Sequence, residues 1–281
     1  MLFLLKTGLI GAFTGVMQGV LGVGGGFILI PLLNLVHFPM HLAIGTSFVY
    51  VFFTTGTGVL AHASQGRIDA VLVLPLIASA VVTVQAGAAF AHILPETTLQ
   101  LLFGGLTLVV CFTFLGGGQW GLLQGARPSN RPLASSLQPA RFYIIPRTRT
   151  LAGKKLTFEV DLPKGVLIGG VTGFVSGMLG VGGGWLLVPL LVLVMRIPLH
   201  IAIGTSLLAI LGPAAVGALT YWKSGNVDLY ASLSLILSGM AAAWAGARMV
   251  SRLSERVLRQ FFISLLFSAA LYMLVLGFRG L

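Results

Sequence analysis

Two glycine-rich segments are the strongest candidates for chemistry in this sequence. Each contains the run Gly-Val-Gly-Gly-Gly, at residues 22–26 and again at residues 180–184. Such a run favours non-helical backbone with unpaired N–H groups, and the helix that follows directs the positive end of its dipole toward them. This arrangement binds anions. The predicted ligands are the backbones of Gly22, Gly24, Gly25, Gly26, Gly180, Gly182, Gly183 and Gly184.

Other residues near these runs are expected to hold helices together. Gly11, Gly15 and Gly19 precede the first run at intervals of four residues, a spacing that gives membrane helices a small-residue face for close packing. Gln18 and Gln85 are expected to be buried amides that form hydrogen bonds between helices. We expect packing at these positions and ligand binding by the backbone of the runs themselves.

A polar motif is duplicated directly after each glycine run. The pattern His-x3-Gly-Thr-Ser begins at residue 41 and recurs at residue 200. Its hydroxyls either face a substrate pathway or donate to the carbonyl one turn earlier, as Ser and Thr commonly do in apolar helices. Both interpretations stay open. The predicted substrate contacts are Thr46, Ser47, Thr205 and Ser206.

Histidine is the candidate residue type for proton transfer in this sequence. No Asp or Glu lies within a predicted membrane span, so the carboxylate relays of many proton-driven carriers are missing. His41 and His200 occupy equivalent positions in the two halves and are the candidates, with a neutral imidazole at the membrane interface as the alternative. Asp69 and Asp228 lie in short turns and are expected to cap helices.

The elements that position these motifs must lie in a membrane. Of the 281 residues, 57% are apolar and 8% are charged, whereas a soluble domain carries about 25% charged residues. No Asp, Glu, Lys or Arg occurs from Thr7 to Gly66, which is typical of polytopic membrane proteins. We therefore expect an all-α polytopic membrane protein. Cys111 is the single cysteine, so neither an intrachain disulfide nor a cysteine-based metal cluster is available. We expect no cofactor and no metal site.

The chain contains an internal duplication. Leu9–Leu33 matches Leu167–Leu191 at 16 of 25 positions, and Pro39–Ser47 matches Pro198–Ser206 at 7 of 9. Internal repeats in an apolar chain are typical of secondary transporters, whose substrate site lies where the repeats meet. We assign residues 1–118 to the first membrane repeat, 119–164 to a basic linker and 165–281 to the second membrane repeat.

Each repeat holds about four hydrophobic segments, of which the last three have spanning length. They are Leu42–Ala61, Ala70–Ala91, Thr97–Gly116, Ile201–Tyr221, Leu229–Ala247 and Leu258–Gly277. The first segments, Leu2–Val36 and Val166–Met195, contain the glycine runs. Each is either a discontinuous helix that crosses once, which makes the repeats parallel, or a hairpin that turns back, which makes them inverted. We favour inverted repeats, because residues 248–259 carry four Arg and the equivalent residues 89–100 carry none.

Positive charge is concentrated between the repeats. The formal net charge is +11, from 17 Lys and Arg against 6 Asp and Glu, and eight of the basic residues lie in the linker. Basic loops remain on the cytoplasmic side of a membrane. The charge therefore indicates a cytoplasmic linker attracted to anionic lipid headgroups, with a regulatory docking site as the alternative, and no nucleic-acid binding.

The duplicated pattern G-x3-G-x3-G-x2-G-x-GGG-x4-P-L-L, followed by H-x-A-I-G-T-S and a basic linker, resembles the sulfite exporter TauE/SafE family, also called the toluene sulfonate uptake permease family. The resemblance extends from Leu9 to about Gly277. It implies a multi-pass carrier of the bacterial inner membrane that moves small anions such as sulfite, organosulfonates or related sulfur-containing or carboxylate anions.

Two other classes of function compete with transport. An anion-selective channel would need a continuous polar lining, whereas the spans hold only scattered Ser, Thr and Gln. An intramembrane hydrolase would need an activated nucleophile, and neither Ser47 nor Ser206 has a G-x-S-x-G context. We expect a transporter and not an enzyme, with a small anion and membrane lipids as its partners; the sequence does not predict an oligomeric state.

Overall fold

The computed structural model describes residues 2–21, 23–115, 143–151, 154–249 and 255–280. Gly22, one of the predicted ligands, and most of the linker lie outside the described residues. Within this part of the chain, eight helices are long and apolar enough to cross a membrane. They are α1 (Leu2–Leu21), α3 (Met40–Ala63), α4 (Ala70–Ile93), α5 (Glu96–Leu115), α7 (Leu162–Leu179), α9 (Leu199–Lys223), α10 (Leu229–Met249) and α11 (Glu255–Arg279). The predicted polytopic membrane protein is confirmed.

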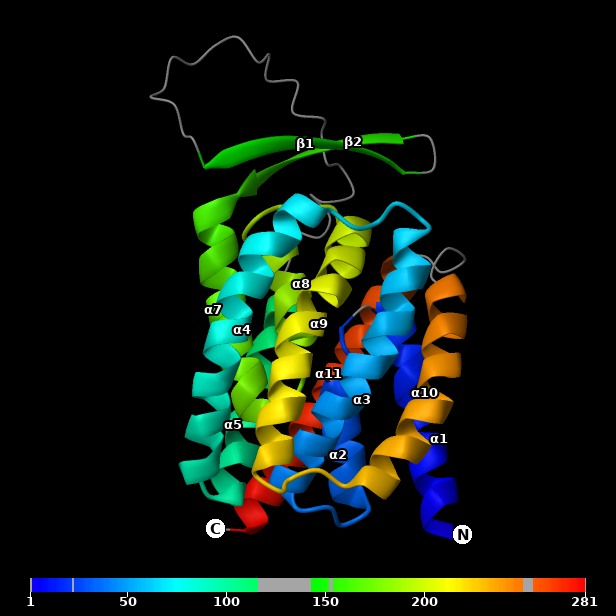
Figure 1. The fold of residues 1–281 in the computed structure, drawn as a ribbon, viewed down its shortest axis with the longest axis vertical. Helices are drawn as coiled ribbons and strands as arrows, with labels where there is room; N and C mark the ends of the chain where they lie inside the picture. Colours follow the sequence, from blue (N-terminus) through cyan, green and yellow to red (C-terminus); the bar gives the residue numbers. More distant parts are fainter. Residues whose placement is uncertain (1, 22, 116–142, 152–153, 250–254, 281) are drawn as a thin grey trace.

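Two shorter helices, α2 (Gly26–Leu35) and α8 (Gly184–Leu193), begin at the glycine runs. The chain turns back at the first run, because Phe3 near the start of α1 stacks on Phe38 just after α2, with ring centroids 6.0 Å apart. In the second half, Lys164 in the first turn of α7 and Met195 just after α8 line the same surface pocket. Each first segment is therefore a helical hairpin. The α1–α2 hairpin opens near the chain termini and the α7–α8 hairpin opens at the opposite end (Figure 1).

Packing between the halves dominates the helix bundle. Helix α1 packs along α10, α4 along α7, α3 against α9, and α5 against α11. Every one of these pairs takes one helix from each half (Figure 1). In the sequence duplication, α1 aligns with α7 and α4 aligns with α10. The α1–α10 pair therefore corresponds to the α4–α7 pair.

The glycines before the first run allow this close packing. A Cβ on Gly15 would collide with the carbonyl oxygen of Gly239 in α10, and one on Gly19 would collide with that of Ala243. In the other half, Gly177 of α7 meets the carbonyl oxygen of Val84 in the same way. The predicted small-residue packing face is confirmed.

The linker contains a β-hairpin that the all-α prediction missed. Strand β1 (Ile144–Leu151) pairs antiparallel with β2 (Lys154–Asp161) at the end of the bundle opposite the termini (Figure 1). The missed signal is the alternation in β2, where buried Phe158 and Val160 alternate with exposed Thr157 and Glu159. Helix α7 begins directly after β2, so residues 162–164 belong to the helix and not to a loop.

Candidate functional site

Each glycine run caps a short helix with a left-handed residue. The N-cap of α2 is Gly25, with φ of 62°, and the N-cap of α8 is Gly183, with φ of 78°. Residues with a side chain adopt this left-handed conformation only with strain. Because glycine has no side chain, neither cap provides a side-chain acceptor for the first N–H groups of the helix.

The two glycine runs lie against each other in the middle of the bundle. A Cβ on Gly26 would lie 2.9 Å from the Cα of Val181, and one on Gly184 would lie 2.6 Å from the carbonyl carbon of Val23. Gly24 and Gly184 both face the side chain of Ile210 in α9. The structure thus brings together the predicted ligands of the two halves, apart from Gly22.

Backbone N–H groups are left unpaired at the second run. Leu186 and Leu187 donate to the carbonyl oxygen of Gly183, at 3.2 and 2.9 Å. Within the described part of the chain, no oxygen accepts from the N–H groups of residues 182–185. In the first run, the N–H of Gly26 donates to the carbonyl oxygen of Gly24 at 2.6 Å, while no oxygen of the described residues accepts from the N–H groups of residues 24, 25 and 27.

A small cavity adjoins the second run. Gly182 and Gly183 form part of its wall, and α4, α7, α8 and α9 supply the rest. Its polar side chains are Thr172, whose hydroxyl donates to Ile168 at 2.8 Å, and Ser176. Ser176 is fully buried, and its hydroxyl has no hydrogen-bond partner among the described residues.

The amide of Gln18 lies beside the first run. Its Nε2 donates to the hydroxyl of Thr55, and its Oε1 accepts from the hydroxyl of Thr54, both at 2.7 Å. The prediction of a buried amide that joins helices is confirmed for Gln18. It is wrong for Gln85, whose side chain is exposed on the outer face of α4. Apolar residues on either side of a glutamine predict that it lies in a membrane span. Which face of that helix is buried depends on the neighbouring helices.

The predicted threonines form hydrogen bonds between the halves. The hydroxyl of Thr46 accepts from the backbone N–H of Asp228, and that of Thr205 accepts from the N–H of Asp69, both at 3.1 Å. Each threonine is fully buried. This symmetric pair of bonds ties the start of one spanning helix to the turn of the opposite half.

The predicted serines lie one residue further along the same helices. Ser47 donates to the carbonyl oxygens of Ile44 and Gly180, and the second bond joins α3 to the glycine run of the other half. Ser206 donates to the carbonyl of Ile203 at 2.9 Å. The structure therefore places Ser47 in contact with a predicted ligand, while direct substrate contact by these hydroxyls stays a prediction.

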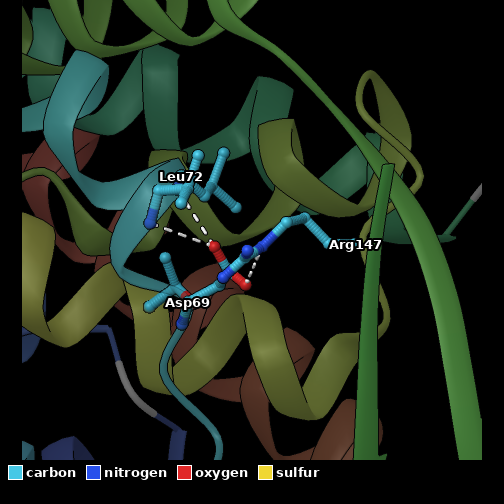
Figure 2. Close-up of polar contacts among 5 residues, drawn as sticks. Asp69, Leu72 and Arg147 are labelled. Carbon is cyan, nitrogen blue, oxygen red and sulfur yellow. Dashed lines mark hydrogen bonds and ion pairs between the residues drawn. The ribbon is translucent and has the colours of Figure 1, made fainter. Parts of the chain in front are cut away.

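Asp69 is a helix cap that also anchors the linker. Its Oδ1 accepts from the N–H groups of Val71 and Leu72, at 3.1 and 3.2 Å, which confirms the predicted cap. Its Oδ2 forms an ion pair with Nε of Arg147 in β1, at 2.9 Å (Figure 2). The Asp228 carboxylate accepts from an N–H of α10 in the equivalent capping role.

The histidine candidates have partners that the sequence did not indicate. His41 stacks on His92, with centroids 6.1 Å apart, and His92 lies 5.1 Å from the ring of Tyr221. At the linker end, His200 is close enough for its charge to act on the fully buried His62.

Arg67 lies in the turn beside this second histidine pair. Burial lowers the pKa of its guanidinium group. Its Nη1 is buried without a hydrogen-bond partner among the described residues. Across those same residues, no three His, Cys, Asp or Glu side chains are grouped so that they could hold a metal ion.

Comparison with known proteins identifies the family. Residues 7–273 match the family described as Sulfite exporter TauE/SafE. The chain belongs to the TauE/SafE family. Its similarity to curated members is distant but extends over nearly the full length, as expected for a shared architecture. No solved structure matches the chain.

Three relatives illustrate the breadth of this family. "Probable membrane transporter protein YunE" of Bacillus subtilis is 25% identical over 256 residues, covering 88% of this chain and 87% of the relative. A "Probable membrane transporter protein" of Xylella fastidiosa is 28% identical over 270 residues, covering 94% and 92%. "Probable membrane transporter protein MJ0441" of Methanocaldococcus jannaschii is 23% identical over 285 residues, covering 95% and 94%. This TauE/SafE protein is a membrane transporter.

Proposed function

We propose that this TauE/SafE protein is a secondary transporter of small anions, with sulfite and organosulfonates as its substrate class. The observation that carries the proposal is the meeting of the two glycine runs in the middle of the bundle, where unpaired N–H groups of residues 182–185 adjoin a cavity. The carrier transfers the anion between the two sides of a bacterial inner membrane.

The electrostatics of this place favour an anion over a cation. The N-terminal end of α8 carries a partial positive charge, and its first N–H groups need acceptors. No charged side chain lines the cavity, so an arriving anion meets dipoles and not a fixed countercharge. Dipoles in a medium of low dielectric hold an anion firmly enough for selectivity while still allowing its release.

We also propose that the two halves are inverted repeats. Two features support this: the α1–α2 and α7–α8 hairpins open at opposite ends of the bundle (Figure 1), and the helix pairs between the halves correspond under the duplication. Such an arrangement gives two similar gates around one central site, as alternating access requires. The linker hairpin and its basic residues then face the cytoplasm.

Uptake into inside-out membrane vesicles tests this function. We expect protein-dependent, saturable uptake of sulfite or of a sulfonate when these anions are presented beside carboxylates and a neutral analogue of similar size. A protein-dependent ionic conductance that does not saturate would instead establish a channel. Failure to move any anion of the panel, with the protein shown to be inserted, would contradict the proposal.

A further inference from the structure

The interface between the halves is built alike at its two ends. At each end, the start of a spanning helix of one half packs on the turn after a spanning helix of the other half. A Cβ on Gly204 of α9 would lie 2.5 Å from the carbonyl oxygen of Arg67, and one on Gly45 of α3 would collide with the carbonyl oxygen of Asn226. The backbone is thus the same at both ends, and any difference between them lies in the side chains.

The side chains at the two ends differ in charge. In the duplication, the aligned pairs are His62 with Tyr221, Arg67 with Asn226, and His200 with His41. Histidines occur at both ends, since His41 also stacks on His92. A neutral amide, however, stands where the linker end has a guanidinium group. Among the residues just named, Arg67 therefore carries the one charge that is permanent at neutral pH.

The charge of Arg67 is buried without a countercharge. This residue lies in the turn between α3 and α4, at the end of the bundle that carries the linker hairpin (Figure 1). Only 8% of it is exposed, and its Nη1 has no hydrogen-bond partner among the described residues. None of the described Asp and Glu residues forms an ion pair with it, and Asp69, the nearest acid in the sequence, pairs with Arg147. A buried cation without a partner costs free energy, which a bound anion would recover.

The surroundings of Arg67 connect it to the first glycine run. The charge of Arg67 acts on the ring of His62, and this ring lies beside the carbonyl group of Gly19 in α1. Gly19 precedes the start of the run by three residues. An anion held at Arg67 therefore lies on the linker side of the place where the two runs meet.

A guanidinium group suits an oxyanion better than any other cation in a protein. Its planar fork of N–H donors binds two oxygens of one group at the same time. Sulfite and the sulfonate head group offer this chemistry, with three oxygens around one sulfur. A cation in a partly buried site also raises the local concentration of anions, because the low dielectric of its surroundings strengthens the attraction.

We infer that Arg67 binds the transported sulfite or sulfonate at the linker end of the bundle and supplies its countercharge there. Asn226 offers no such charge at the other end. The inference rests on the proposed anion transport, and it adds a side chain that binds the substrate and the end of the bundle at which it does so.

Substitutions of Arg67 test this inference. Sulfite binding to the purified protein in detergent is measured by calorimetry, with methanesulfonate as a second probe. Arg67→Asn introduces the residue of the equivalent position and should weaken binding at least about tenfold, as expected for the loss of hydrogen bonds to a charged group. Arg67→Lys keeps the charge without the fork and should bind with intermediate affinity.

Arg196 provides the matched control. It is an exposed arginine beside the linker hairpin, and asparagine tolerates its left-handed φ of 56°. Arg196→Asn changes the net charge of the protein as Arg67→Asn does, and it should leave the affinity within about twofold of the wild type.

Thermal unfolding separates binding from a structural role. Without sulfite, Arg67→Asn should unfold at no lower temperature than the wild type, because it removes a buried charge that has no partner. Sulfite should raise the unfolding temperature of the wild type and of Arg196→Asn but not that of Arg67→Asn. Unfolding of Arg67→Asn well below the wild type without sulfite would assign a structural role to Arg67 and overturn the inference.

The remaining outcomes separate this inference from the proposed function. Wild-type affinity in Arg67→Asn, or an equal loss in Arg196→Asn, would overturn the inference while leaving anion transport intact. Absence of binding by the wild type would also overturn it. The proposed function fails as well only if the membrane vesicles take up neither probe.

Discussion

At the scale of single residues, the same side chain has different roles on different helix faces. Gln18 and Gln85 both lie within apolar spans, and the sequence predicts the same role for both. The structure buries Gln18 completely and leaves Gln85 exposed. Only the packing of α1 against α3 and α10 creates the buried environment, and that packing cannot be read from local hydrophobicity.

This difference predicts unequal costs of substitution. Gln18→Ala removes two hydrogen bonds of 2.7 Å inside the bundle and should lower the free energy of unfolding by about 1–2 kcal/mol. Gln85→Ala is the matched control and should change it by less than about 0.5 kcal/mol. Thermal unfolding in detergent measures both, and equal shifts of the two variants would contradict this account of Gln18.

At the scale of elements, the sequence predicts the spans well because a membrane imposes their length. The segment predicted at Leu42–Ala61 is α3, Met40–Ala63, and the predicted break at the first run is where α2 begins. The sequence does not decide whether the broken segment crosses or turns back, since both need the same apolar residues. The strands of the linker and the ion pair between Asp69 and Arg147, 78 residues apart, depend on tertiary contacts.

That ion pair should hold the linker hairpin against the bundle. The Asp69 carboxylate is fully buried, while the Arg147 side chain is 30% exposed, so the pair is expected to contribute on the order of 1 kcal/mol after screening. Arg147→Ala should speed hydrogen exchange of residues 143–161 several-fold, whereas Thr148→Ala, at the exposed neighbouring position, should not. Asp69→Asn should reproduce the effect, and the double variant should add nothing further. Exchange in Arg147→Ala as slow as in Thr148→Ala would contradict this role.

At the scale of the whole molecule, the account depends on how the halves are oriented. In the proposed inverted arrangement, the equivalent helix starts at Glu96 and Glu255 lie on opposite sides of the membrane. Helix α5 begins at the end that carries the chain termini, and α11 begins at the end that carries the linker hairpin (Figure 1). This orientation gives one central site access from either side.

Cysteine labelling tests the orientation. In a Cys111→Ser background, single cysteines at Thr97, Arg256 and Ser135 are exposed to an impermeant thiol reagent, first in intact cells and then after lysis. Thr97→Cys should react in intact cells, whereas Arg256→Cys and Ser135→Cys in the linker should react only after lysis. Labelling of the Thr97 and Arg256 positions from one side would establish parallel repeats and reject the inversion.

The central claim is that a small anion passes through the meeting point of the two glycine runs, and counterflow in proteoliposomes tests it most directly. Gly25→Val and Gly183→Val each force a branched side chain onto a left-handed residue packed in that place. Gly105→Val, where an added Cβ meets nothing within 4 Å, is the matched control. We predict saturable sulfite counterflow by the wild type and the control, and less than about a tenth of it in the two run variants. Wild-type counterflow in both folded run variants would contradict the claim.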